Sequence, residues 1–242
     1  MIYKTENSVD GIITCLYHSF LYKEYPSDVV CQNFSPTFFE NVKEIAVDKE
    51  AVKRVRLALL KYDSFIFERV YIAFRYGKDE KFKIIFDFLH LTLAEQKSVI
   101  KMFGNEKVLA FNDITQKVWQ ERHRFLGFLR FIETASGVLY ANFTPDNDIA
   151  DLLSSHFIKR MNLPFIIHDS KRNKMVLFNG KDVKTVISDV LPTVILSKDE
   201  EKFTKLFKLY FNSVNIKERK NTRLQNGYLP KRYRKNMTEF KN

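Results

Sequence analysis

The positively charged residues of this chain are concentrated at its carboxyl end. Residues 217–242 contain nine Lys and Arg against two Glu, a net charge of +7, whereas the whole chain carries +11. Tyr228, Tyr233 and Phe240 are interleaved with these cations. Positive side chains pair with phosphates and flat rings stack on bases, so the pattern predicts a contact with nucleic acid. The alternative is a basic tail that is surrounded by water alone. The cations are Lys217, Arg219, Lys220, Arg223, Lys231, Arg232, Arg234, Lys235 and Lys241.

Residues 117–131, KVWQERHRFLGFLRF, hold the densest mixture of rings and cations in the interior of the chain. The first part has helical spacing, which would place Trp119 and His123 on one face. The end would continue as a strand in which Arg130 shares a face with aromatic neighbours, and a buried Arg needs an anion. We therefore predict a nucleic-acid contact on a sheet face; the alternative places Arg130 on the solvent side of the sheet. The predicted face consists of His123, Arg124, Arg130, Tyr140 and Asn142.

Three side chains could act as general acids or bases. His168 and Asp169 are adjacent in a predicted strand, where neighbours point to opposite faces, so the two cannot act on each other. His156 lies on a predicted helix one turn from Lys159 and Arg160, where an imidazole could bind phosphate or donate a proton. The alternative is that these residues belong to an ordinary core. His156, His168 and Asp169 are the catalytic candidates, and Lys159 and Arg160 join the predicted nucleic-acid contacts.

The chain lacks the residue spacings of common cofactor sites. Its five histidines form no HxxxH or HExxH pair, and there is no glycine-rich phosphate loop. Cys15 and Cys31 are the only cysteines, and without a CxxC pair they cannot supply a four-thiolate zinc or iron–sulfur site. We expect free thiols in a reducing compartment. Asp146 and Asp148, which follow Pro145, suit a turn and a helix cap better than a metal pair. We therefore predict no metal and no cofactor.

Residues 1–112 predict a mainly helical region. Residues 1–4 alternate apolar and polar side chains like a short strand, and residues 8–25 have the spacing of a helix that Pro26 ends. Between residues 48 and 101, three apolar stripes predict three short helices in a row. A further helix is expected from about residue 113 to residue 125.

Residues 113–216 predict an antiparallel sheet with flanking helices. FLRFIE and VLYANF read as a hairpin, and PFIIHD, KMVLF and DVKTVI read as strands, with a type I′ turn at Asn179-Gly180 between the last two. One helix is expected at 148–160, capped by Asp146 or Asn147. Another is expected at 197–211, with Ser197 as cap and Glu200 three residues on. The apolar face of that last helix would hold Phe203, Leu206, Phe207 and Tyr210.

These elements predict an α+β fold. A helical N-terminal layer (1–112) would precede an antiparallel sheet with packed helices (113–216) and a basic aromatic segment (217–242), and the three parts could form one integrated domain. The chain is 45% hydrophobic and 29% charged, as in folded globular proteins. No apolar run approaches the roughly 18 residues that cross a bilayer, and the first residues do not resemble a secretory signal. We expect a cytoplasmic protein that does not act at a membrane.

Five sequence blocks resemble a bacterial family assigned to DNA metabolism or DNA repair. The blocks are HRFLGFLRF (123–131), GVLYANFTPDNDI (137–149), SSHFIKRM (154–161), FIIHDSKR (165–172) and YFNSVNIKERKNTRLQNGYLPKRYRKNMTEF (210–240). The resemblance covers most of the chain and is best from about residue 117. Domains of that family also occur fused to a uracil-DNA-glycosylase-like domain, and stand-alone members are encoded beside a radical-SAM protein related to spore photoproduct lyase. The resemblance implies a DNA-linked role and a radical-SAM partner.

Three functions fit these observations. The first is a DNA-binding accessory protein of a DNA repair or modification system that works with the radical-SAM protein. The second is an enzyme acting on a damaged or modified base or on the nucleic-acid backbone, which would need a pocket for an extruded nucleotide. The third is an adaptor whose basic tail binds an acidic protein surface. The family context favours DNA over RNA, although charge and stacking suit both.

Overall fold

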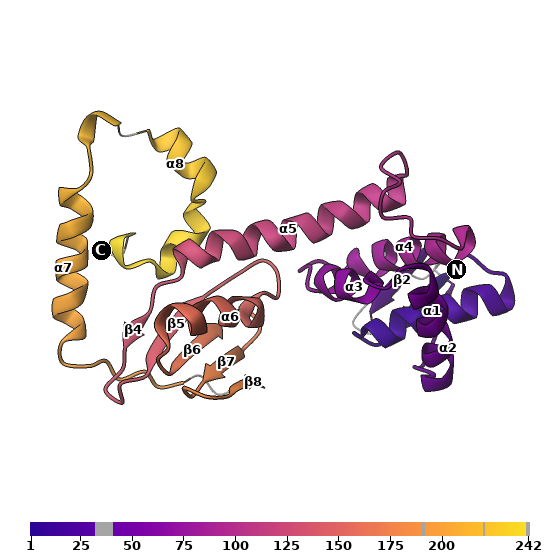
Figure 1. Ribbon diagram of the computed structural model, residues 1–242, viewed down its shortest axis with the longest axis horizontal. Helices are drawn as coiled ribbons and strands as arrows, with labels where there is room; N and C mark the ends of the chain where they lie inside the picture. The colour runs from indigo at the N-terminus through magenta and orange to yellow at the C-terminus, as the bar shows by residue number, and fades with distance from the viewer. Residues whose placement is uncertain (32–40, 190–191, 220, 241–242) are drawn as a thin grey trace. The chain divides into compact units, whose positions relative to one another are not determined.

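The computed structural model describes residues 1–31, 41–189, 192–219 and 221–240. Mixed helices and strands divide into two units, Met1–Trp119 and Gln120–Asn242. The first unit is largely helical, and the second contains a five-stranded sheet with packed helices, as the α+β prediction has it (Figure 1).

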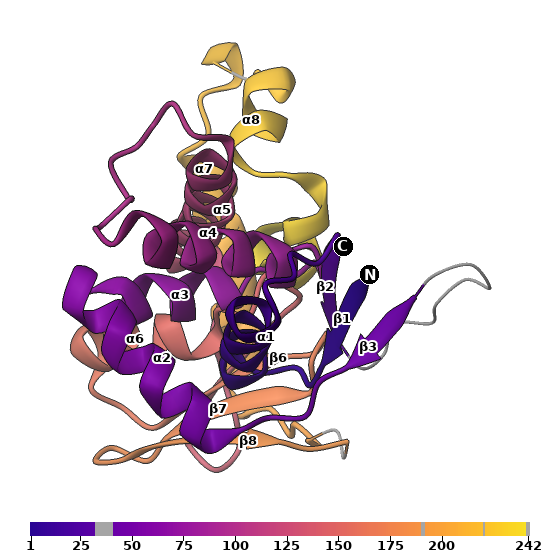
Figure 2. The same ribbon diagram turned by 90° about the vertical axis from the view of Figure 1, so that its right-hand side faces the viewer.

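The first unit contains a short parallel sheet that the sequence patterns did not predict. Strand β1 (Ile2–Thr5) lies between β2 (Asp28–Cys31) and β3 (Val42–Glu44), and it pairs in parallel with both (Figure 2). Helix α1 (Val9–Tyr22) follows β1, and the Ser8 hydroxyl caps it by accepting from the Gly11 N–H. The N-terminal strand and helix were predicted correctly. Strands β2 and β3 have only four and three residues, too few for a period-2 pattern to stand out.

Three helices follow the sheet, as the apolar stripes predict. They are α2 (Lys49–Tyr62), α3 (Ile66–Phe74) and α4 (Lys81–Glu95). The Asp48 carboxylate caps α2 by accepting from the N–H groups of Glu50 and Ala51. Their buried faces form a core rich in Phe, in which the rings of Phe88 and Phe111 stack with centroids 3.8 Å apart.

Helix α5 (Glu106–Phe128) is longer than the predicted 113–125 segment, and it begins in the first unit and ends in the second. It runs through Gly127 without a break, and a Cβ at Gly127 would meet no heavy atom within 4 Å. Gly127 therefore does not permit a close backbone approach, and the helix ends just after it, as the predicted change to a strand requires.

The second unit is built on a sheet of order β4-β5-β6-β7-β8. Its strands are β4 (Ile132–Glu133), β5 (Leu139–Phe143), β6 (Phe165–Asp169), β7 (Lys174–Phe178) and β8 (Val183–Ile187). The antiparallel prediction is right for three of the four pairs. It is wrong for β5 and β6, which are parallel because α6 (Ala150–Met161) forms the crossover between them and packs on β6 and β7.

In this unit the predicted turns and helix caps are less accurate than the predicted helices and strands. Asn179 does not have the positive φ that a type I′ turn requires; instead residues 179–182 form a four-residue loop in which Asn179 Oδ1 accepts from the N–H groups of Lys181 and Asp182. No side chain caps α6, whose preceding residues bond elsewhere. Helix α7 (Glu200–Ser213) also lacks the predicted capping box. Ser197 and Glu200 instead hydrogen-bond to Glu133 of β4.

The chain after α7 returns to the sheet. Helix α8 (Thr222–Tyr228) is followed by two 3₁₀ helices, η2 (Lys231–Asn236) and η3 (Thr238–Phe240), and η1 (Lys217–Arg219) precedes it. We call residues 221–240 the C-terminal arm. Its η2 packs on β5 and its η3 packs on α7, where the ring of Phe240 contacts that of Phe211. The predicted apolar face of α7 is otherwise exposed, from 37% at Phe207 to 62% at Tyr210.

Candidate nucleic-acid interface

A buried carboxylate holds the C-terminal arm against the rest of its unit. Glu121 of α5 is 3% exposed. Its two oxygens accept hydrogen bonds of 2.7–2.8 Å from the N–H groups of Asp146 and Asn147, from the Asn147 side chain and from the hydroxyl of Tyr233. A buried charge is tolerated when donors surround it in this way. Glu121 therefore joins α5, the loop after β5 and the arm at one point.

Tyr233 is the arm's main anchor. It is 5% exposed, and its ring lies 4.8 Å from that of Phe125, which in turn contacts Phe143 of β5 at 4.9 Å. Burial raises the pKa of Tyr233 to about 12, so its hydroxyl stays protonated and donates to Glu121. Because this ring faces inward, Tyr233 does not offer the stacking surface predicted for it while the arm is docked. Tyr228, 73% exposed, is the outward-facing tyrosine of the arm.

Some of the arm's cations are engaged within the protein. Arg232 pairs with Asp146 at 2.7 Å, with its side chain still 59% exposed. Arg234 donates to Asn226 Oδ1 and to the Leu229 carbonyl. Other cations of this segment are exposed, and Lys220 and Lys241 lie outside the described residues. The exposed ones are Arg219, Arg223, Lys231 and Lys235.

Arg130 is held by the arm and does not lie free on a sheet face. It precedes β4 and forms two hydrogen bonds to the Glu239 carboxylate, at 2.6 Å and 3.3 Å. The Glu239 side chain is only 3% exposed and that of Arg130 is 26% exposed. Arg130 also donates to the Gly127 carbonyl at 2.6 Å. The anion expected beside Arg130 is therefore the carboxylate of Glu239, not a phosphate of a ligand.

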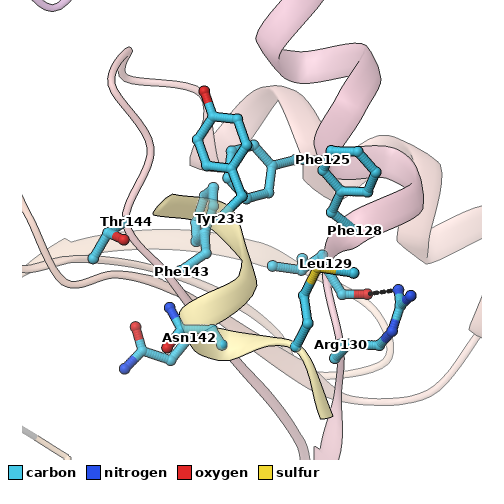
Figure 3. Close-up of a pocket in the computed structure, with 10 residues that line it drawn as sticks. Phe125, Phe128, Leu129, Arg130, Asn142, Phe143, Thr144 and Tyr233 are labelled. Carbon is cyan, nitrogen blue, oxygen red and sulfur yellow. Dashed lines mark hydrogen bonds between the residues drawn. The ribbon is translucent and has the colours of Figure 1, made fainter. Parts of the chain in front are cut away.

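A small pocket lies where α5, β5 and the arm meet (Figure 3). Aromatic and aliphatic residues make up most of its lining, and Arg130 and Asn142 contribute polar groups from opposite sides. It has room for about one water molecule, too little for an extruded base. Its lining comprises Phe125, Phe128, Leu129, Arg130, Asn142, Phe143, Thr144, Tyr233, Asn236 and Met237.

The two adjacent candidates on β6 face opposite ways, as predicted. His168 is 2% exposed, and its Nδ1 lies 2.6 Å from the hydroxyl of Tyr140 on β5, which is 7% exposed. Burial lowers the pKa of His168 and raises that of Tyr140, so both are neutral at pH 7. Asp169 pairs with Arg172 at 2.8 Å. Burial raises the pKa of Asp169, and Arg172 opposes that shift.

The remaining predicted residues divide between buried contacts and the surface. Asn142 accepts from the Ser170 hydroxyl at 2.9 Å, and His156 packs against the Phe157 ring. His123 on α5 is exposed, and Arg124 beside it is partly exposed. Lys159 and Arg160 are exposed at the end of α6. The structure therefore brings Arg130, Asn142 and Tyr233 around one pocket and buries Tyr140 with His168. The predicted cations that it leaves exposed and without a described ion pair are Lys159, Arg160, Arg219, Arg223, Lys231 and Lys235.

Sequence reasoning missed Glu121 and Glu239, and it gave Asn147 only the role of a possible helix cap. A signal for Glu121 was present: it is spaced three residues after Val118 and four before Phe125, on the apolar stripe of α5. A carboxylate on a buried stripe requires internal donors. Glu239 carried no such signal, because its partner Arg130 is 109 residues away in the sequence.

Charge is distributed unequally between the two units. Met1–Trp119 contains 17 Lys and Arg against 16 Asp and Glu, a net of +1, whereas Gln120–Asn242 contains 23 against 13, a net of +10. Several acids of the second unit are turned inward or paired: Glu121, Glu239 and Asp169 are buried, and Asp148 and Asp151 contact Lys174. The outer surface of this unit is therefore dominated by cations.

A second pocket, of about 420 Å³, lies in the first unit between residues of α1 and α2. In the described parts of the chain, no cluster of three or more His, Cys, Asp or Glu side chains is placed to hold a metal ion. Cys15 and Cys31 are both buried and free. None of the described helices is both long enough and apolar enough to cross a bilayer.

Comparison with known proteins gives one match. The model of a family described as a domain of unknown function, DUF4130, matches residues 79–239, about two thirds of the chain. No curated protein and no solved structure matches. The match includes α4, most of the second unit and the residues that dock the C-terminal arm. The chain belongs to the DUF4130 family.

Proposed function

We propose that the protein is a DNA-binding accessory of a DNA repair or modification system and that it grips DNA with the cationic surface of its second unit. The observation that carries this proposal is the net charge of +10 on Gln120–Asn242 beside +1 on the first unit. Since the cations of the second unit outnumber its acids by ten, its excess positive charge favours a partner with negative charge. A polyphosphate backbone is such a partner.

The docked arm supports the proposal in a modified form. Tyr233 and Arg232 use their ring and guanidinium for contacts within the protein, and these contacts hold the neighbouring Lys231 and Lys235 of η2 in place. Arg223 is exposed on α8. Fixed cations lose less side-chain and chain freedom on binding than those of a flexible tail. Arg219, Lys159, Arg160 and His123 add further exposed contacts.

An enzyme acting on a base receives less support. The pocket beside Arg130 has room for about one water molecule, and neither His168 nor Asp169 lines it. The buried pair of Tyr140 and His168 is explained as a satisfied internal hydrogen bond between neighbouring strands. Base chemistry would require these groups to reach an extruded nucleotide.

The test is a salt titration of DNA binding with matched charge variants. In the first variant, Arg223→Gln, Lys231→Gln and Lys235→Gln are combined; in the control, Lys53→Gln, Arg54→Gln and Lys61→Gln remove three exposed cations from α2. We expect wild-type binding to weaken as salt rises. The slope of log K against log salt is negative. In the first variant it should become shallower by about 0.9 for each duplex phosphate that loses its cation. The control should keep the wild-type slope.

Two results would contradict the proposal: binding that salt does not weaken, or equal reductions of affinity in both triple variants. The partner is tested separately. The resemblance to proteins encoded beside radical-SAM proteins favours that class of companion. We expect the purified protein to co-elute with the neighbouring radical-SAM protein after nuclease treatment; co-elution that needs intact DNA would show that DNA alone links them.

A further inference from the structure

An exposed group of rings at the end of α1 has no role in the proposed DNA grip. Phe20 and Tyr25 flank His90 of α4: the rings of Phe20 and His90 stack at 4.6 Å with an angle of 15°, and Tyr25 meets His90 edge-on at 4.9 Å. All three residues belong to the first unit. We call Phe20, Tyr25 and His90 the ring cluster.

The ring cluster is open to solvent. Phe20 is 44% exposed and Tyr25 is 47% exposed, and the intervening Leu21 and Tyr22 are 55% and 52% exposed. His90 stacks on one face of Phe20, and 44% of Phe20 is exposed all the same, so the part of the ring that points away from His90 is open to solvent. Several Phe side chains of this unit, such as Phe82, Phe86 and Phe88, are instead fully buried. Burial in the core therefore does not explain these outward rings.

Ammonium groups lie beside the rings. Lys83 Nζ and Lys107 Nζ are 4.5 Å and 4.6 Å from the centre of the Tyr25 ring, and Lys107 also donates to the Tyr25 hydroxyl at 2.7 Å. Asp87 is the acid of this group, and it bonds both Lys83 and the Tyr25 hydroxyl. With two ammonium groups and this one carboxylate, the charges of Lys83, Lys107 and Asp87 sum to +1. A flat ring next to this excess positive charge matches a base next to its phosphate.

We propose that the ring cluster with Lys83 and Lys107 is a stacking site for single-stranded DNA. A base stacks on the open face of Phe20, and the adjoining phosphate contacts Lys107. In a duplex the base faces are covered by their neighbours, so duplex DNA offers this site nothing to stack. The inference rests on the proposed function, which gives DNA as the ligand. It adds a second contact, specific for single strands, on the first unit.

The proposal is tested by changing the ring and measuring single and double strands in parallel. The probes are a fluorescent oligothymidine of about ten nucleotides and a duplex of similar charge. Phe20→Ala is expected to weaken single-strand binding about 5- to 150-fold and to leave duplex binding unchanged. Phe20→Trp should restore single-strand binding, because it restores a ring. The matched control is Phe65→Ala, which removes a 56% exposed ring elsewhere in the same unit and should change neither affinity.

Lys107→Gln provides a second variant that keeps every ring. For the single strand, the slope of log K against log salt should become shallower by about 0.7, the value for one phosphate contact. Unchanged single-strand binding in both Phe20→Ala and Lys107→Gln would overturn the stacking site. If the arm variant Arg223→Gln/Lys231→Gln/Lys235→Gln still weakens duplex binding in that case, the proposed function stands alone. If the arm variant leaves DNA affinity unchanged and Phe20→Ala lowers single-strand affinity, the proposed cationic surface is contradicted and the stacking site is supported.

Discussion

The central residue of the second unit is an acid in a basic protein. Glu121 is buried with four donors around it, and these come from the loop after β5 and from the arm. Removing a carboxylate from water is costly unless hydrogen bonds replace the lost hydration. Formation of this site and docking of the arm are therefore coupled, because Tyr233 supplies one of the donors.

Tyr233→Phe tests that coupling at a single oxygen atom. The ring keeps its contacts with Phe125, but Glu121 loses one donor in a buried place. We expect the free energy of unfolding to fall by about 1–3 kcal/mol. Urea unfolding followed by circular dichroism measures the change. Tyr228→Phe, at a 73% exposed position of the same arm, is the control and should leave stability unchanged. Equal effects of the two substitutions would remove the anchoring role from Tyr233.

His168 should make the protein less stable in mild acid. Burial lowers the pKa of His168 in the folded protein, so the unfolded chain binds a proton more readily. The stabilising effect of the neutral imidazole is complete above the unfolded value of about 6.5 and is lost as pH falls below it. We expect unfolding free energy to decrease between pH 7 and pH 5, by at most about 1.4 kcal/mol per pH unit for this group.

The variant His168→Gln isolates this contribution. It should reduce the pH dependence without abolishing it, because burial also lowers the pKa of His18 and His90. His123→Gln, on the exposed side of α5, serves as the control. A pH profile for His168→Gln that is parallel to the wild-type profile would assign the acid sensitivity to other groups.

At the scale of elements, helices α1 and α5 each contain a glycine, but only the glycine of α1 lies against another part of the chain. A Cβ on Gly11, in the first turn of α1, would lie 2.6 Å from Thr5 Oγ1 and 2.9 Å from the Glu6 carbonyl oxygen. The backbone at Glu6 cannot rotate away as a flexible side chain could. The close approach of α1 to the end of β1 therefore depends on a residue without a side chain.

Gly11→Ala should destabilise the protein in spite of alanine's higher helix propensity. Overpacking costs about 1–3 kcal/mol, whereas the propensity gain is about 1 kcal/mol. Gly127→Ala, where a Cβ meets nothing within 4 Å on α5, should be neutral or stabilising by up to about 1 kcal/mol. Thermal unfolding of both variants gives the comparison. A stabilising effect of Gly11→Ala would show that α1 can shift away from β1 at little cost.

At the scale of the whole molecule, the sequence predicts elements better than their partners. Repeating patterns reveal α2–α4 and strands β5–β8, because each amphipathic element carries its own period. The parallel pairing of β1 with β2 and β3 leaves no such local mark, since it joins segments that are far apart in the chain. Strands β5 and β6 are parallel because a helix, α6, connects them. The sequence pattern predicts this helix, and the parallel pairing could have been inferred from it.

The candidate site shows the same limit. Composition identifies the basic segment and its exposed Arg223, Lys231 and Lys235. It does not reveal that Tyr233 turns inward, because the partner Glu121 is 112 residues away and a ring between cations suits either an internal or an external contact. Long-range hydrogen bonds decide which polar residues remain available, and single-sequence patterns do not carry that information.

The two units offer two different contacts on one chain, so the length of a single strand should matter. A strand of about eight nucleotides can occupy either the ring cluster or the cationic arm, and a strand long enough to reach both contacts can occupy both. The second contact is then intramolecular, so affinity should rise more steeply with length than the number of binding registers alone predicts. We expect Phe20→Ala and the arm triple variant each to abolish this extra gain, while a duplex of the same length, bound by the arm alone, shows no effect of Phe20→Ala. Anisotropy titrations over a series of lengths measure it. A length dependence that is the same in wild type and in Phe20→Ala would mean that the two units bind independently of each other.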